Sequence, residues 1–265
     1  MSVKVFDDER IRSVRWHDLA GLRPWETVKE LVLPLPWLAA SLLLAHRGLY
    51  APALACSFLF YLAGLRQVHD AYHQNLGISR RAGNALMFAL SVLMLGSMHV
   101  VRHNHLHHHR HCLDDEDVEG ASARMSGWRA LLLGPVFPVR QHAHALRAAK
   151  PRQRHWMAAE LAANAAWIGF VFAVLRAPAL CYHVVAMAAG QAFSAFFCVW
   201  TVHHGCDSSH RIARTLRSRL KSFLSMGMFF HLEHHLFPKV PTCRLPILAE
   251  RLDRAAPELQ EMQVF

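Results

Sequence analysis

The sequence predicts an all-α integral membrane protein, with four transmembrane helices in two hairpins and a cytoplasmic helical cap that holds a histidine-rich site. Two features of the composition predict the membrane class: only 18% of the 265 residues are charged and 53% are hydrophobic. Soluble domains carry about 25% charged residues. A third feature predicts the site, because the 21 histidines outnumber the 19 acidic residues.

Four apolar runs are the candidate spans, since a bilayer core of about 30 Å requires roughly 20 apolar residues. The runs cover residues 31–44, 52–68, 161–175 and 179–202. The connection between the first two runs is very short, and so is the connection between the last two. The four runs therefore predict two helical hairpins.

Two further apolar runs are interpreted differently. Residues 84–101 follow Arg80 and Arg81 and continue into a histidine-rich polar segment. This run is long enough to span, but we interpret it as a helix that dips into the membrane or lies along the interface. Residues 130–139 contain Gly134 and two prolines, which predicts an interfacial segment.

The distribution of charge predicts the orientation. With four spans, the two short connections hold only Arg47 and Arg176 of the 29 basic residues. The positive-inside rule then places the active site and both termini in the cytoplasm, and the Ala- and Arg-rich composition suggests a bacterial inner membrane. A fifth span would remove this asymmetry. The same rule accounts for the net charge of +10, so nucleic-acid binding is not predicted.

We expect a single membrane domain over residues 1–265, with a cytoplasmic N-terminal segment at 1–30 and a catalytic domain at 31–250. Three histidine clusters lie within the catalytic part. They are H-x-x-x-H at His69 and His73, H-x-x-H-H at His105, His108 and His109, and H-x-x-H-H at His231, His234 and His235.

The spacing of the clusters predicts a metal site. Residues three and four apart share one face of a helix, so each cluster directs its imidazoles to the same side. Eight convergent imidazoles are too many for one tetrahedral zinc and suit two metals with open positions. Imidazole binds iron, zinc, copper and nickel, so ligand type alone does not identify the metal.

The register of the second cluster has an alternative, because four other histidines form an i, i+4 stripe through the same segment. We prefer the cluster at 105–109 as the ligand face, since its spacing repeats that of the third cluster. The alternative stripe consists of His99, His103, His107 and His111.

These motifs resemble the membrane fatty-acid desaturase and hydroxylase superfamily. The matching pieces are HDAYH at 69–73, R-x-x-H-x-x-H-H at 102–109 and HLEHHLFP at 231–238, and the resemblance covers about residues 30–250. It implies a non-haem di-iron centre under four spans, with all eight cluster histidines catalytic. It also implies O₂-dependent attack on an unactivated C–H bond.

The resemblance implies one more metal ligand at the end of the fourth span, where the chain has His203 and His204. Neighbouring residues project about 100° apart on a helix, so only one of them is expected to serve, and we prefer His203. The chain departs from the family where many members have an acidic-Pro-acidic element, since residues 114–117 read DDED. The three residues inside the first cluster favour lipid-chain and carotenoid-type branches over the acyl-CoA branch.

Carboxylates near the clusters are candidates to accept the second N–H of a ligating histidine. We expect this role for Asp70, inside the first cluster, and for Asp207, after the fourth run. One or two members of the acidic run at 114–117 are expected to serve in the same way, and Glu233 is a further candidate.

The expected function is O₂-dependent desaturation of an alkyl chain in an acyl lipid by two iron ions. A hydroxylase or ketolase of a lipid or carotenoid-like substrate is the alternative within the superfamily, because nothing in the clusters separates the outcomes. A membrane metal transporter is the alternative from another class. It predicts ligands near the middle of the membrane, whereas these histidines follow the ends of apolar runs.

The substrate and the electrons must both reach this site. We expect an apolar tunnel for the alkyl chain, and Tyr72, Trp200, Phe229 and Phe230 are candidates for its lining or for core packing. The chain has no dinucleotide fingerprint or iron–sulfur run, so an external donor such as ferredoxin, or a b-type cytochrome with its reductase, is expected. A basic stretch suits either an acidic donor or anionic membrane lipids; it contains Arg140, Arg147, Lys150, Arg152 and Arg154.

Overall fold

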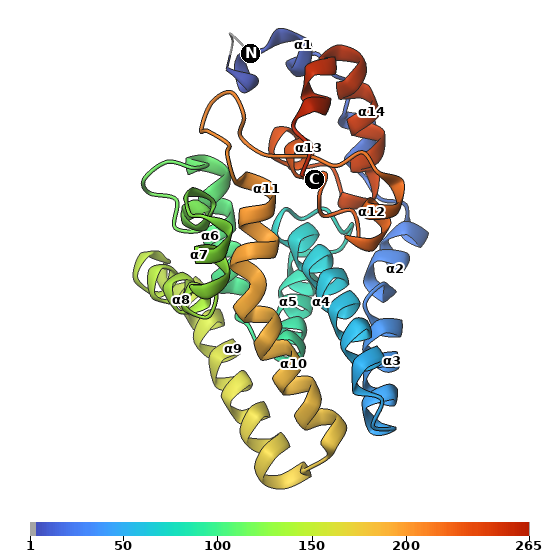
Figure 1. The fold of residues 1–265 in the computed structure, drawn as a ribbon, viewed down its shortest axis with the longest axis vertical. Helices are drawn as coiled ribbons and strands as arrows, with labels where there is room; N and C mark the ends of the chain where they lie inside the picture. The colour runs from blue at the N-terminus through green and yellow to red at the C-terminus, as the bar shows by residue number, and fades with distance from the viewer. Residues whose placement is uncertain (1–3, 265) are drawn as a thin grey trace.

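The computed structural model describes residues 4–264, and this part of the chain is helical, with one isolated β-bridge between Thr215 and Gln263. The long helices form a bundle, and the short helices near the two termini lie together over one end of it (Figure 1). The first eight α-helices are α1 (Glu9–Arg12), α2 (Pro24–Val32), α3 (Leu35–His46), α4 (Tyr50–Tyr72), α5 (Arg80–Met94), α6 (Met98–His111), α7 (Gly127–Leu132) and α8 (Val136–Ala148).

The remaining α-helices are α9 (Pro151–Gly169), α10 (Pro178–Ser194), α11 (Thr201–His203), α12 (Arg219–Leu224), α13 (His231–Leu236) and α14 (Leu245–Ala255). Two π-helical segments, η4 (Phe170–Leu175) and η5 (Ala195–Trp200), continue α9 and α10. Short 3₁₀ helices are η1 (Val5–Asp7), η2 (His17–Leu19), η3 (Gly120–Arg124), η6 (Thr242–Arg244) and η7 (Pro257–Glu261).

Four helical stretches in residues 4–264 are long and apolar enough to cross a membrane: Pro24–His46, Tyr50–Tyr72, Pro151–Leu175 and Pro178–His203. Each of the four predicted runs lies inside one of them, which confirms the all-helical class and the four candidate spans. Three of the stretches begin with a proline at the first helical position, where its missing N–H costs nothing. The helices therefore extend beyond the apolar runs into flanking polar residues.

The fifth apolar run is interrupted in the middle. Helices α5 and α6 meet at an angle of 111°, so the pair counts as a fifth span only if it is taken as one bent element. Leu95 ends α5 in the left-handed conformation, with φ of 54°, and Ser97 caps α6 by accepting a hydrogen bond from the backbone of Val100. The break turns the second histidine cluster away from the direction of α5.

Glu160 of α9 fixes the break from one side. Its carboxylate, which has no exposed surface, accepts hydrogen bonds from Ser97 Oγ at 2.6 Å and from the backbone N–H of His99 at 3.1 Å. His99 Nδ1 lies 2.7 Å from the same carboxylate, and Trp156 stacks on the His99 ring. A buried acid on α9 thus sets where α6 starts.

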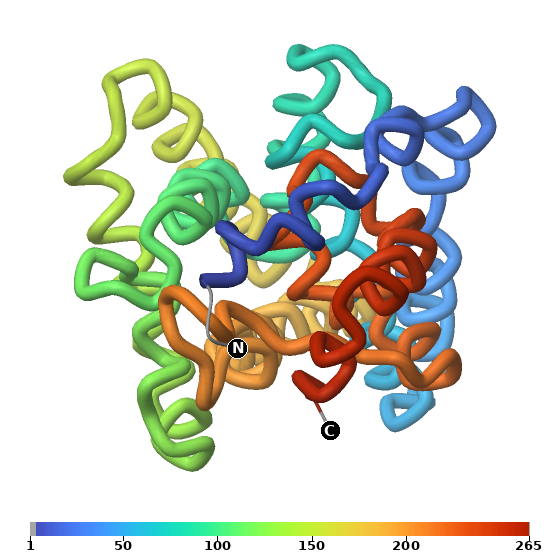
Figure 2. Tube along the Cα trace, turned by 90° about the horizontal axis from the view of Figure 1, so that it is seen from above, coloured from blue at the N-terminus to red at the C-terminus, as the bar shows by residue number. Residues whose placement is uncertain are grey.

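The short helices at the two ends of the chain share one hydrophobic core. Val5, Ile11 and Leu19 from the N-terminal segment pack with C-terminal residues such as Leu232 and Leu248, all buried. From above, the blue N-terminal segment crosses over the middle of the molecule, close to the red C-terminal segment (Figure 2). This core forms a cap that presses α13 onto the ends of the long helices.

The π-helical segment η5 lies directly before α11 and therefore before His203. A π-helix is wider than an α-helix because its hydrogen bonds join residues five apart. Such segments usually appear as single turns at functional sites. Here the segment places an extra residue in the helix directly before His203.

Candidate metal centre

Nine histidines converge where the long helices meet the cap. They come from four places far apart in the sequence, and all except the half-buried His109 are buried. The contributors are His69 and His73 at the end of α4, His105, His108 and His109 of α6, His203 of α11, and His231, His234 and His235 of α13.

Eight of these histidines form two groups of four, and in each group one ring nitrogen per residue lies within 4.8 Å of the others. The first group is His69, His73, His105 and His234; the second is His108, His203, His231 and His235. His109 lies between the groups. Its Nε2 is 2.8 Å from His234 Nε2, and its ring stacks on His235 at 4.4 Å.

The second group shows why these residues fit a cation. His203 Nδ1 donates to the carbonyl oxygen of Ile212 at 2.9 Å, so its neutral ring has a lone pair on Nε2. His108 Nδ1 lies 2.7 Å from the carboxylate of Asp117, and its Nε2 is 3.1 Å from His203 Nε2. Burial lowers the pKa of His108, but the carboxylates of Asp117 and Glu119 raise it overall. Once this ring is neutral, the two rings direct lone pairs at one another, and a cation between them removes the repulsion.

The first group contains a second sign of a missing partner. Both ring nitrogens of His69 are buried without a hydrogen-bond partner, although buried polar atoms are nearly always paired. The neighbouring rings of His73, His105 and His234 lie within 5.3 Å of it, centre to centre. A metal ion bound by this group would satisfy His69.

The protonation states also suit metal binding. Burial, followed by repulsion from His105, Lys239 and Arg102, lowers the pKa of His73 to about 2. Burial and neighbouring imidazoles likewise lower the pKa values of His231, His234 and His235 well below the usual range. Neutral imidazole is the form that binds metals, so these side chains need not lose a proton to hold a metal ion at neutral pH.

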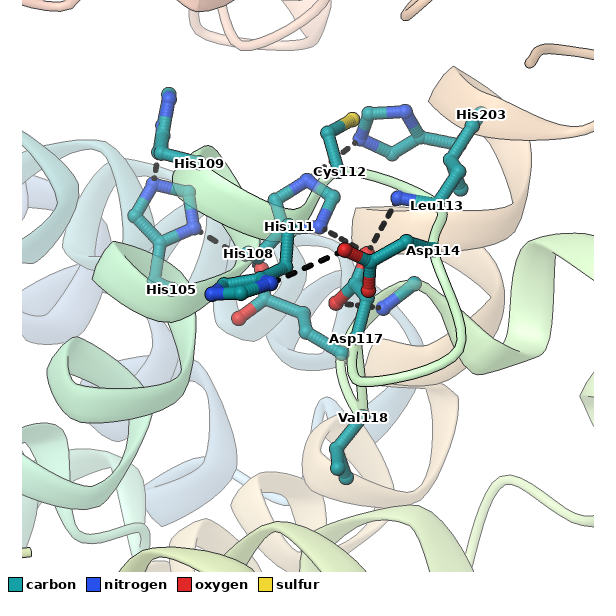
Figure 3. A network of polar contacts seen from close by, with 12 residues as sticks. His105, His108, His109, His111, Cys112, Leu113, Asp114, Asp117, Val118 and His203 are labelled. Carbon is teal, nitrogen blue, oxygen red and sulfur yellow. Dashed lines mark hydrogen bonds and ion pairs between the residues drawn. The ribbon is translucent and has the colours of Figure 1, made fainter. Parts of the chain in front are cut away.

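Two carboxylates contact ring nitrogens on the side away from the neighbouring imidazoles and so orient the rings of His108 and His105. Asp117 binds His108 Nδ1 and also accepts from the backbone N–H groups of Leu113 and Gly120, both at 2.8 Å (Figure 3). Glu119 lies 3.0 Å from His105 Nδ1. Burial raises the pKa of Asp117, but the hydrogen bond and charge attraction of His108, together with the backbone hydrogen bonds from Gly120 and Leu113, outweigh it and lower this pKa to about 2. An ionised acceptor of this kind fixes the tautomer and orientation of a ligating ring.

Asp70 and Asp207 have other partners than the ones expected from the sequence. Asp70 accepts from the backbone N–H and the hydroxyl of Thr242, both at 3.0 Å, and so holds η6 against α4. Asp207 accepts from the backbone N–H groups of Ser209, His210 and Arg211 and closes a tight turn. Asp70 follows His69 directly, and a step of about 100° around the helix turns its side chain away from that ring.

His203 and His204 are separated by the same rotation. His203 faces the second group, 2.9 Å from His231 Nε2. His204 instead stacks on Trp200, with ring centres 4.0 Å apart, and its Nδ1 lies 2.9 Å from the Trp200 carbonyl oxygen. Of the two histidines, only His203 therefore lies at the centre.

The alternative stripe on α6 lies outside both groups of four. His99 binds Glu160, His103 faces His144 of α8 at 6.1 Å, and His107 stacks on His111 at 4.2 Å. The register with His105, His108 and His109 toward the centre is the one in the structure.

Two carboxylates important to this arrangement were not singled out from the sequence. Glu119 lies just beyond the acidic run, and Glu160 lies at the edge of an apolar run. A lone acid beside a candidate span is itself a signal, because ionisable residues at membrane depth are rare and functional. That signal could have found Glu160, whereas Glu119 depends on how the loop folds back.

Replacing Asp117 with asparagine is expected to weaken metal binding about 10- to 100-fold, the usual cost of losing an outer partner of a ligating histidine. Metal retained against increasing chelator measures the effect. Asp115→Asn is the matched control, because Asp115 lies in the same loop with its side chain fully exposed. Equal metal retention in the two variants would contradict the role assigned to Asp117.

Comparison with known proteins agrees with this geometry. The family model described as fatty acid desaturase matches residues 34–264, which include all nine convergent histidines. No curated protein matches the chain. The match covers well over half of the 265 residues. The chain belongs to the fatty acid desaturase family.

Proposed function

We propose that the protein is an O₂-dependent di-iron desaturase that introduces a double bond into the alkyl chain of an acyl lipid. The observation that carries this proposal is the pair of buried four-histidine groups in a chain of the fatty acid desaturase family. The membrane-compatible helices support a lipid substrate. Iron is proposed because it accepts imidazole ligands and because the family resemblance implies it.

In this proposal each group of four histidines holds one iron ion, and His109 lies within reach of both groups. An iron pair bound there would supply the dioxygen chemistry that attacks an unactivated C–H bond. In the overall reaction, neighbouring carbons of the chain lose two hydrogens. These hydrogens, two electrons from a donor and two protons reduce O₂ to two waters. Asp117 and Glu119 keep the rings of His108 and His105 in place throughout.

The alkyl chain is proposed to lie in an apolar groove between α4 and α10. The groove has a volume of about 640 Å³ and includes Leu65 and Cys198 in its lining. Leu65 is one helical turn before His69 and Cys198 is five residues before His203, so one end of the groove is about 6–8 Å along each helix axis from the backbone of a convergent histidine. Both walls belong to candidate spans, which favours a substrate dissolved in the bilayer.

The groove differs from the tunnel expected from the sequence. Tyr72 donates to Met98 Sδ, and the Trp200 indole donates to the Met125 carbonyl oxygen. Other residues line the groove instead, both large ones such as Phe58 and Phe193 and small ones such as Ala55, Ala189 and Gly190.

Replacing Ala189 with tryptophan is expected to fill the groove and to reduce turnover of long-chain lipids at least about tenfold, with iron content unchanged. Ala189 lines the groove and is exposed, so the larger ring enters open space. Ala188→Trp is the matched control, since Ala188 is exposed on the same helix and is not part of the lining. Equal losses in both variants would remove the groove from the proposal.

The orientation and the electron supply belong to the same proposal. We place the cap, the metal centre and both termini in the cytoplasm of a bacterial cell, with electrons from a ferredoxin or a b-type cytochrome and its reductase. Exposed basic residues around the junction of α8 and α9 suit an acidic donor or anionic headgroups. They are Arg140, Arg147, Lys150, Arg152 and Arg154.

The proposal is tested with purified protein reconstituted with iron, lipid vesicles, ferredoxin with its reductase, NADPH and O₂. A desaturase gives a product that has lost two hydrogens from the acyl chain, whereas a hydroxylase or ketolase gives one that has gained oxygen. Either oxygenated product would replace the desaturase proposal by the alternative in the same superfamily. One tightly held zinc, with no oxygen-dependent product after iron loading, would contradict an oxidase altogether.

A further inference from the structure

A third set of metal-binding side chains lies on the other side of α6. The set consists of His107, His111 and Glu116, and one ring nitrogen or carboxylate oxygen of each residue lies within 4.8 Å of those of the other two. His107 and His111 are one helical turn apart, and their rings are nearly parallel, 4.2 Å between centres and 11° between planes. Glu116 comes from the loop that follows α6 and folds back beside it. None of the three belongs to the buried four-histidine groups.

A carboxylate holds one of these rings from behind, as at the buried centre. His111 Nδ1 lies 3.0 Å from Asp114 Oδ2, and Figure 3 shows this contact next to the His108–Asp117 pair. The other oxygen of Asp114 accepts the backbone N–H of Glu116 at 2.8 Å, which directs Glu116 toward the histidines. Its Oε2 lies 3.5 Å from His111 Nδ1. Because the Asp114 carboxylate accepts the hydrogen of His111 Nδ1, the lone pair on His111 Nε2 is left to bind a metal ion.

Access distinguishes this set from the buried centre. The side chains of His111 and Glu116 are 33% and 73% exposed, so an ion in solution can reach them without any opening of the fold. His144 of α8 borders the set, with its ring 5.7 Å from that of His107. Two imidazoles and one carboxylate form a donor set that zinc-like ions bind well.

We propose that His107, His111 and Glu116 form a separate, exchangeable site for a divalent transition-metal ion of the zinc type, with water in the open position. The site is coupled to the buried centre through the loop at 112–117. In this loop Glu116 is followed directly by Asp117, whose carboxylate lies 2.7 Å from His108 Nδ1. Binding at the surface therefore restrains the segment that orients a buried ligand.

The test uses the full-length, iron-loaded protein in detergent, titrated with Zn²⁺ alone. Bound zinc and retained iron are counted after unbound metal is removed. The expected result is one zinc per chain without loss of iron, and at least tenfold weaker zinc binding in His111→Ala and in Glu116→Gln. Asp115→Asn is the matched control, because it removes one charge from the same exposed loop and should bind zinc like the unaltered protein.

Several results would overturn the proposal. Zinc gained in proportion to iron lost would place the zinc in the buried centre. Zinc binding that is absent in the unaltered protein, or equal in the Glu116→Gln and Asp115→Asn variants, would also exclude the site. Glu116 is exposed enough that its substitution leaves folding intact, so an unstable His111→Ala protein would not prevent the decision.

Discussion

His234→Ala is expected to lose most of its bound iron and to turn over substrate at least about 100-fold more slowly than the unaltered protein. His234 belongs to the first group of four, and its Nε2 also lies 2.8 Å from His109 Nε2. Loss of a mere outer partner costs 10- to 100-fold in affinity or activity, so loss of a ligand should cost more. Iron per chain and product formation are measured on the same preparation.

His204→Ala is the control for this variant, because His204 is adjacent to a proposed ligand but stacks on Trp200 instead. It should retain its iron. Both proteins should elute as the unaltered protein does in gel filtration, which separates metal loss from misfolding. Normal iron and normal turnover in His234→Ala would refute the assignment of the first group.

Glu160→Ala is expected to destabilise the protein by about 2–6 kcal/mol, because it leaves two buried donors unpaired at a cost of about 1–3 kcal/mol each. The substitution leaves the Ser97 hydroxyl and the His99 backbone N–H without their acceptor. It also frees the start of α6, and the second histidine cluster is carried by α6. A lower thermal unfolding midpoint in detergent and a lower iron content are therefore expected together.

Glu160→Gln separates the two effects of that substitution. Its amide keeps the volume and one acceptor oxygen, so the bend should persist and the loss of stability should be smaller. His155→Ala, at an exposed position on the same helix, should change neither stability nor iron content. A Glu160→Ala protein as stable as His155→Ala would show that the break between α5 and α6 holds without the acid.

The sequence was a good guide to the helices because apolar runs of membrane length have few alternatives. It placed the start of the third candidate span at residue 161, however, whereas the helix begins at Pro151. Arg152 and Arg154 make the first turns too polar for hydropathy to detect, although they do not oppose helix formation. The break after Leu95 was anticipated only as a dip toward the interface, since the contacts of Glu160 that fix it join residues about sixty positions apart.

The site could be predicted to the level of its convergent histidines and no further. Spacing alone brings His105, His108 and His109 to one face of a helix, and the structure has that register. The partners of those rings depend on how the loop after α6 folds, which explains why Glu119 was overlooked. Tertiary contacts of the same kind explain why Asp70, adjacent to His69 in sequence, reaches Thr242 instead.

The π-helical segment η5 affects where the chain can tolerate the deletion of a residue. A π-helical turn holds one residue more than the α-helical turn it replaces, and each residue rotates the helix by about 100°. Deleting a single residue from Ala195–Trp200 would restore an α-helical turn and leave His203 facing the centre, because the residue lost is the extra one. The same deletion in α10, where the turns are α-helical, would rotate the helix end by about 100° and bring His204 to the place of His203. The chain therefore tolerates the loss of one residue at η5 but not one turn earlier, although both deletions leave the histidines and the apolar character of the span the same.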